Sequence, residues 1–336
     1  MTQFPGSLVD IATHLPEQVV PNSVFAQAHP EWRVEQTEKK TGVFERRIAR
    51  ADETAYDLGL AASRKLLAKH DKLAGKIDAI IFCTQSADYI MPSNAFLLQR
   101  DLGLGTDILA FDYNLACSGY VVGLLMASSF IKTGIARNVL LVTADTYSKY
   151  LDQDDRATMM LFGDGAAASW IAAPGESDSS PLIASFEDIQ CGSDGKGWNK
   201  FIIKSGGMRQ PPACAGASDY SDKISMNGMQ VVNLVNHQVV KHIVKLLAKH
   251  KLSPDQIDQF FLHQASGLAI AAISQKLNVS PDKVYVNIGQ IGNTVSSSLP
   301  ILIKDYFSGA TLAPGSKVLL CGFGVGFSWG SILASI

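Results

Sequence analysis

The sequence has no long apolar run, no excess of charge of one sign and no paired cysteines. No uninterrupted apolar stretch approaches the roughly twenty residues that a membrane-spanning helix needs, and Met1–Pro5 does not open a secretory signal. The net charge is −2, from 29 basic and 31 acidic residues, which gives no global attraction to nucleic acid or to an anionic membrane. We therefore expect a cytoplasmic protein with neither nucleic acid nor a membrane as partner.

The five cysteines are scattered along the chain and form no Cys-x-x-Cys pair. This pattern argues against a disulfide framework and against structural zinc. The acidic run Asp152–Asp155 lacks the glycine and the spacing of a calcium loop, so no metal site is predicted. We therefore expect any chemistry of the cysteines to be that of a thiolate.

What the chain does contain is ample apolar material in an alternating pattern of strands and helices. It has 336 residues, of which 47% are hydrophobic, and short β-rich runs alternate with longer helical ones. Such alternation predicts an α/β fold in which helices cover parallel strands. The first series comprises a strand at 77–84, a helix at 93–102, a strand at 108–113, a helix at 116–132 and a strand at 139–143. The second comprises a strand at 257–263, a helix at 267–277, a strand at 283–287, a helix at 294–307 and a strand at 317–321.

The two series repeat at a nearly constant offset. Ile77 aligns with Ile257, 180 positions later, and Val139 aligns with Val318, 179 positions later. An offset of about half the chain predicts a duplicated α/β unit, with halves at 1–175 and 176–336 joined by the breaker-rich segment 174–181. The long irregular segments 18–50 and 192–225 are expected to form the substrate entrance.

Cys117 stands where a strand gives way to the central helix of the first half. A helix N-terminus lowers the pKa of a thiol and makes it nucleophilic. A small buried cysteine that only fills space is the alternative, but the small neighbours Ser118 and Gly119 leave room for a substrate.

His263 and Asn293 are the residues expected to join Cys117. Asn293 lies 176 positions after Cys117, at the start of the corresponding helix, and His263 ends a buried strand. Taken alone, the histidine would more often be a core residue and the asparagine a helix cap. Together, their side-chain N–H groups would form a two-donor pocket for an anionic oxygen.

The glycine-rich run 322–330 is similar to a dinucleotide loop only superficially. Six residues remain after Gly330, too few for the helix, second strand and ribose-binding acid of that motif. We expect glycines such as Gly324 to let the backbone approach a thioester, with a simple packing turn as the alternative.

Several ordered motifs together resemble the β-ketoacyl synthase III family of the thiolase superfamily. The resemblance runs over nearly the whole chain. Its motifs are Thr41-Gly-Val-Phe-Glu-Arg-Arg-Ile-Ala, Ala116-Cys-Ser-Gly, Asp155-Arg156, Phe162-Gly-Asp-Gly-Ala, His263-Gln-Ala, Gly292-Asn-Thr and the run from Gly322-Phe-Gly to Trp329-Gly.

The resemblance implies a thiolase-like fold of two duplicated halves with layered α-β-α-β-α architecture, and an acyltransferase of the EC 2.3.1 class. Cys117 would attack an acyl thioester while its N–H and that of Val325 hold the oxyanion. His263 and Asn293 would stabilise the enolate that forms when a malonyl-type thioester loses carbon dioxide, and this enolate would take the acyl group in a Claisen condensation.

The resemblance also implies the ligands and the assembly. Thioesters of coenzyme A or of an acyl carrier protein would be substrates, without a tightly bound cofactor, in fatty acid or polyketide biosynthesis. Trp32 and Arg156 match contacts to the nucleotide end, Ser266 and Gly324 are further substrate-binding candidates, and Met91 would reach across a homodimer into the partner's acyl pocket.

Departures from the family pattern favour a branch in specialised metabolism. Ser266 replaces an asparagine, Val325 replaces a loop glycine, and Asn233 and Leu268 stand where carrier-docking residues are basic. An acyltransferase that delivers the acyl group to oxygen or nitrogen without decarboxylation stays open as an alternative. A catalytically silent subunit fits less well because all three site residues are present. A papain-like protease fits less well because Cys117 is mid-chain. A non-decarboxylating thiolase fits less well because it should have a histidine where Asn293 stands.

Overall fold

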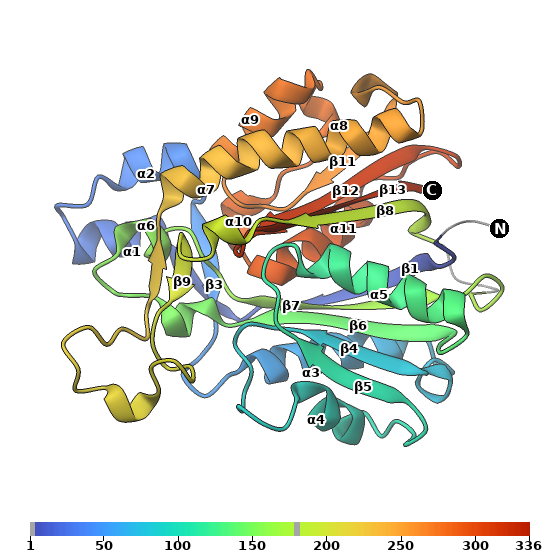
Figure 1. Cartoon of the computed structure of the whole chain (residues 1–336), viewed down its shortest axis with the longest axis horizontal. Helices are drawn as coiled ribbons and strands as arrows, with labels where there is room; N and C mark the ends of the chain where they lie inside the picture. Colours follow the sequence, from blue (N-terminus) through green and yellow to red (C-terminus); the bar gives the residue numbers. More distant parts are fainter. Residues whose placement is uncertain (1–3, 178–181) are drawn as a thin grey trace.

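The structure is a computed structural model that describes residues 4–177 and 182–336, so part of the predicted connection at 174–181 lies outside the described residues. A nine-stranded sheet runs through the molecule in the order β11-β12-β13-β8-β1-β7-β6-β4-β5 (Figure 1). The strands are β1 (Ser7–His14), β4 (Ala79–Cys83), β5 (Leu109–Tyr113), β6 (Asn138–Asp145), β7 (Gly165–Ala172), β8 (Ala184–Ser193), β11 (Gln259–Leu262), β12 (Lys317–Gly324) and β13 (Ser328–Ser335).

The two parts of the sheet repeat one strand order. In the N-terminal part β1, β7 and β6 pair antiparallel and β6 pairs parallel with β4. In the C-terminal part β8, β13 and β12 pair antiparallel and β12 pairs parallel with β11. The parts meet where Ser7 and Leu8 of β1 pair with Ser185 and Ala184 of β8. This repetition agrees with the duplication inferred from the offset, while the boundary at 175/176 stays a prediction.

Three layers of helices enclose the two parts of the sheet (Figure 1). Helices α3 and α4 pack on one side of the N-terminal part, α8 and α9 on one side of the C-terminal part, and α5 and α11 lie between the two parts. Ile80 and Phe82 of β4 join the cluster beneath α3, whereas Ile81 joins the middle cluster. Because both faces are buried, the strands read as continuous apolar runs in the sequence.

Local signals set the ends of several helices. Thr54 and Asp57 form a capping box at the start of α3, and Gly134 ends α5 in the left-handed region with φ of 76°. The helices are α1 (Asn22–Ala28), α2 (Val34–Thr41), α3 (Ala55–Lys69), α4 (Asn94–Asp101), α5 (Gly119–Thr133), α6 (Arg156–Met159), α7 (Gly228–Leu234), α8 (Val240–Lys249), α9 (Gly267–Leu277), α10 (Ile288–Ile291) and α11 (Ser298–Gly309).

Two predictions about elements are wrong. The strand expected at 283–287 is reduced to one bridge between Val284 and Phe260, because the N–H groups of Asn287 and Ile288 donate to the side-chain oxygen of Gln264 instead of to a neighbouring strand. The glycine-rich run 322–330 was expected to leave no room for a second strand, yet β13 begins within the run at Ser328 and returns antiparallel to β12.

The irregular segments contain two small two-stranded sheets that are separate from the main sheet. They pair β2 (Gln18–Pro21) with β3 (Glu45–Ile48) and β9 (Phe201–Ile203) with β10 (Ile224–Met226). The fully buried Arg46 of β3 donates to Asn22 Oδ1 (2.6 Å) and to the carbonyl oxygen of Met160 (2.9 Å), and the second of these bonds holds the first small sheet against the rest of the molecule. Across residues 4–177 and 182–336, no helix is long and apolar enough to cross a membrane.

Candidate active site

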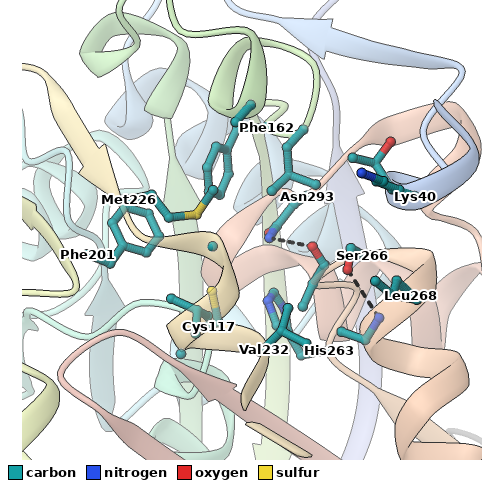
Figure 2. Close-up of a pocket in the computed structure, with 18 of the residues that line it drawn as sticks. Lys40, Cys117, Phe162, Phe201, Met226, Val232, His263, Ser266, Leu268 and Asn293 are labelled. Carbon is teal, nitrogen blue, oxygen red and sulfur yellow. Dashed lines mark hydrogen bonds between the residues drawn. The ribbon is translucent and has the colours of Figure 1, made fainter. Parts of the chain in front are cut away.

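A cavity of about 300 Å³ opens where the two halves meet, and Cys117, His263 and Asn293 all line it. Figure 2 shows these three side chains directed toward one another. Cys117 comes from the segment before α5, His263 directly follows β11, and Asn293 comes from the segment before α11. Residues separated by up to 176 positions thus share one cavity.

Cys117 lies in the short connection between β5 and α5 and is 6% exposed. Strand β12 passes so close that glycine is needed at two positions. A Cβ atom on Gly324 would lie 2.8 Å from the Cβ of Cys117, and one on Gly322 would lie 2.7 Å from its carbonyl oxygen. Packing against the cysteine segment therefore accounts for two glycines of the run.

The Cys117 thiol is neutral near pH 7. Burial raises its pKa, and the nearby Asp145 carboxyl group raises it further. The lowered pKa that the helix N-terminus predicted is therefore wrong, because desolvation of the thiolate outweighs the favourable position before α5.

His263 is held on three sides. Its backbone N–H donates to the carbonyl oxygen of Cys321 (2.8 Å), its Nδ1 lies 2.5 Å from Ser298 Oγ, and the ring packs edge-on against Phe323. Burial lowers the pKa of the imidazole to about 3. The side chain is therefore neutral at pH 7. Its Nδ1 contacts Ser298, which leaves Nε2 to interact with a molecule in the cavity.

Asn293 is fixed by its backbone and by its amide. Gly292 has φ of 70° and passes the carbonyl oxygen of Leu161 so closely that a Cβ atom would lie 2.9 Å from it. Asn293 then donates its backbone N–H to that same oxygen (2.9 Å). Its Oδ1 accepts from the N–H of Val295 (2.9 Å), and its Nδ2 donates to the carbonyl oxygen of Ala265 (3.4 Å). The amide oxygen is thus occupied, and the NH₂ group is presented to the cavity (Figure 2).

The other predicted site residues divide into two groups. Arg156, Ser266, Gly324 and Val325 line the cavity. Ser266 also caps α9, since its Oγ accepts from the N–H of Ala269 (3.2 Å).

Trp32 and Met91 do not line the cavity of this chain. Trp32 stacks on His29, with ring centroids 4.0 Å apart, and Met91 is 79% exposed. The prediction that Met91 reaches into a partner subunit concerns an assembly of two chains and stays a prediction.

Sequence reasoning missed the apolar wall beside Cys117. Phe162, Phe201 and Met226 line the cavity on that side (Figure 2), and Phe162 and Phe201 lie 5.8 Å apart between ring centroids. Lys40 of α2 is a further lining residue. Both irregular segments therefore contribute to the cavity, but their sequences carry no periodic signal that would have singled out these residues. Within the described part of the chain, no group of three His, Cys, Asp or Glu residues is placed to hold a metal ion.

Comparisons with known proteins agree with this architecture. The family model "3-Oxoacyl-[acyl-carrier-protein (ACP)] synthase III" matches residues 111–195, and its C-terminal counterpart matches residues 247–336. The β-ketoacyl-[acyl-carrier-protein] synthase III of Campylobacter curvus is 34% identical over 332 residues, covering 98% of this chain and 96% of the relative. That of Streptococcus uberis is 36% identical over 330 residues, covering 97% of each chain.

A crystal structure of a 3-oxoacyl-(acyl-carrier-protein) synthase III superposes with a TM-score of 0.91 at 40% identity, covering 99% of this chain and 100% of the other. The predicted thiolase-like fold with layered α-β-α-β-α architecture is thereby confirmed. By sequence and by structure, the chain belongs to the β-ketoacyl-[acyl-carrier-protein] synthase III family.

Proposed function

We propose that this protein is an acyltransferase that carries an acyl group on Cys117 and passes it to the carbon of a malonyl-type thioester. The observation that carries the proposal is the shared cavity of Cys117, His263 and Asn293, in which one thiol faces an imidazole and a carboxamide. Membership of the synthase III family, whose name describes ketoacyl synthesis on a carrier protein, supports the same reaction.

In the first half-reaction the sulfur of Cys117 attacks the carbonyl carbon of an acyl thioester. The C–S bond to the donor breaks, and the proton of the Cys117 thiol ends on the departing thiol, so no net charge is left behind. The backbone N–H groups of Cys117 and Val325 are the proposed donors to the oxyanion. Because burial raises the pKa of Cys117, the thiol loses its proton only as the substrate is attacked.

In the second half-reaction a malonyl-type thioester enters and loses carbon dioxide. The electron pair of the breaking C–C bond forms an enolate, whose oxygen accepts hydrogen bonds from Asn293 Nδ2 and His263 Nε2. The enolate carbon then attacks the acyl-cysteine, a C–C bond forms and the C–S bond breaks. Cys117 leaves as a thiolate and takes a proton from water. Neutral donors suit this step, because they stabilise developing negative charge without first requiring a buried cation.

The substrates are proposed to be thioesters of coenzyme A or of an acyl carrier protein, with no tightly bound cofactor. Trp32 and Arg156 are proposed for the nucleotide end, and Ser266 and Gly324 for the bound thioester.

The protein is proposed to work in the cytoplasm as a homodimer with Met91 at the subunit interface, each chain comprising halves 1–175 and 176–336. A specialised pathway is favoured by Leu268, which lines the cavity and is 54% exposed, because the family pattern predicts a basic carrier-docking residue at its position.

The test uses labelled acyl-coenzyme A and acyl-carrier-protein thioesters, followed by mass analysis of the Cys117 peptide and by measurement of carbon dioxide released from malonyl thioesters. We expect a single acyl adduct that Cys117→Ala abolishes and that Cys191→Ala, which removes an exposed cysteine, leaves intact. Acylation without carbon dioxide release would favour transfer to oxygen or nitrogen. Absence of acylation with every thioester would support the silent subunit.

A further inference from the structure

Ser296 and Ser297, which directly precede α11, and Ser298, its first residue, are all fully buried, and each has a different partner. Ser296 donates to Asp145 Oδ2 (2.5 Å), and the single hydroxyl hydrogen of Ser297 is shared between the carbonyl oxygens of Thr143 (2.9 Å) and Gly165 (3.0 Å). Both of these serines tie α11 to the N-terminal half. Ser298 differs, because its Oγ lies 2.5 Å from Nδ1 of His263.

The surroundings of Ser298 favour one direction for this hydrogen bond. The backbone N–H of Gln264 points at Ser298 Oγ (3.4 Å) and can only donate. Gln264 is itself fully buried, and its side chain is bound at both ends, to the carbonyl oxygen of Leu262 (2.8 Å) and to the backbone of α10. The Ser298 oxygen accepts from Gln264 and keeps a second lone pair, so this contact alone does not fix the direction. Among the described residues, however, His263 Nδ1 is the one hydrogen-bond acceptor in contact with the Ser298 hydroxyl, so donation to Nδ1 is the arrangement that leaves no buried hydroxyl hydrogen without a partner.

We infer that Ser298 is a positioning residue that fixes the tautomer of His263, with the hydrogen on Nε2 and directed into the cavity. A ring nitrogen that accepts a hydrogen bond carries no hydrogen, so the remaining nitrogen of a neutral imidazole must carry it. Figure 2 shows a ring nitrogen of His263 pointing toward Cys117 and Asn293. The imidazole is thereby set as a donor to an anionic oxygen and not as a base toward the Cys117 thiol.

This inference rests on the proposed function and makes it more specific. The N–H of Val295 orients the Asn293 amide, and Ser298 orients the His263 imidazole. Two hydrogen bonds thus direct one N–H group of each side chain into the shared cavity. Loss of the Ser298 hydroxyl should then slow the step that needs the His263 donor, namely decarboxylation. Acylation of Cys117, whose oxyanion is held elsewhere, should change little.

The experiment compares Ser298→Ala with Ser297→Ala. Both substitutions remove one fully buried hydroxyl from the same run, but only Ser298 contacts His263. We expect Ser298→Ala to lower the rate of carbon dioxide release from malonyl thioester about tenfold relative to Ser297→Ala, the factor that corresponds to one hydrogen bond. Cys117 acylation, read by mass, should differ by less than about threefold between the two variants, since less than a hydrogen bond's worth of stabilisation is lost there.

Nitrogen-15 NMR of histidine-labelled protein gives a readout that general damage to the fold does not imitate. The wild type should show His263 with hydrogen on Nε2 at pH 7, and Ser298→Ala should show a mixture of tautomers. Ser298→Thr, which keeps a hydroxyl group, should restore the wild-type spectrum, and thermal melts identify any variant that is unfolded.

Hydrogen on Nδ1 in the wild type would overturn the inference, as would equal loss of decarboxylation in the two alanine variants. Failure of the proposed function is a separate result. In that case the wild type releases no carbon dioxide, while the NMR spectrum still reports the tautomer.

Discussion

The effect of burial on the ionisation of this site can be tested directly at Asp145. It ends β6, is fully buried, and accepts from the N–H of Gln85 (2.8 Å) and from Ser296 Oγ (2.5 Å). Burial raises the pKa of this carboxyl group to about 7, because the hydrogen bonds from Gln85 and Ser296 only partly offset the loss of hydration.

The sign of the effect on stability follows from proton binding. The unfolded carboxyl group has a pKa of 3.8, so between about pH 4 and pH 7 the folded chain keeps a proton that the unfolded chain has lost. The free energy of unfolding therefore falls as pH rises through this window, by about 1.4 kcal/mol per pH unit and about 4 kcal/mol in all. The contribution is fully present below pH 4 and is lost above about pH 7.

The perturbation is Asp145→Asn, which cannot titrate. Urea unfolding of both proteins from pH 4.5 to pH 8 gives the difference in unfolding free energy as a function of pH. Changed hydrogen bonds shift this difference by a constant amount, so only its slope tests the argument. Asp154→Asn, in an exposed turn, controls for the loss of one carboxyl group. A difference that stays constant between pH 5 and pH 6.5 would refute the reasoning.

The same variant reports on Cys117. Ionised Asp145 raises the pKa of the Cys117 thiol, so Asp145→Asn should lower that pKa. Alkylation of Cys117 by iodoacetamide should then become faster at a given pH above 7. Unchanged alkylation in a folded variant would show that the two groups do not interact.

Two further predictions concern packing and capping. Gly324→Ala places a methyl group 2.8 Å from the Cβ of Cys117. It should lower the free energy of unfolding by about 1–3 kcal/mol and abolish most of the Cys117 acylation. Gly105→Ala, which has open space around it, should change neither quantity when both are measured by urea unfolding and acylation assays. Thr54→Ala removes the capping box with Asp57 and should lower the unfolding free energy by about 1 kcal/mol without changing acylation, and a loss of acylation with unchanged stability would contradict that assignment.

The strands and helices of the core were predictable because the local spacing of apolar residues reflects which side chains are buried. Helix α9 has the bounds 267–277 that its apolar spacing predicted, and β4, β5 and β11 fall within the predicted strands. The prediction of a strand at 283–287 was wrong because the N–H of Asn287 donates to the side chain of Gln264 and not to the backbone of a neighbouring strand. Only the tertiary fold brings Gln264 to this segment. Such a partner leaves no periodic mark on the segment that it binds.

The site was predictable where duplication supplied a constraint. The offset between the halves links Cys117 to Asn293 through the sequence alone, and both residues line the cavity. Ser298 was not singled out, because a serine next to two others carries no signal until β11 brings His263 to it. The shift of the Cys117 pKa was predicted in the wrong direction for a related reason. The position of Cys117 at a helix N-terminus can be inferred from the local sequence, whereas its desolvation depends on all the residues that pack around the thiol.

The buried polar groups share one property that explains how the cavity can be both apolar and reactive. Burial keeps the Cys117 thiol and the His263 imidazole neutral, and Asp145 holds its proton to near neutral pH. The resting site therefore bears little of the cost of an unpaired buried charge. Negative charge appears only when a substrate carbonyl is attacked or a carboxylate is lost, at the point where fixed N–H donors already converge. Because those donors need no reorientation at that moment, their stabilisation acts on the transition state more than on the resting protein.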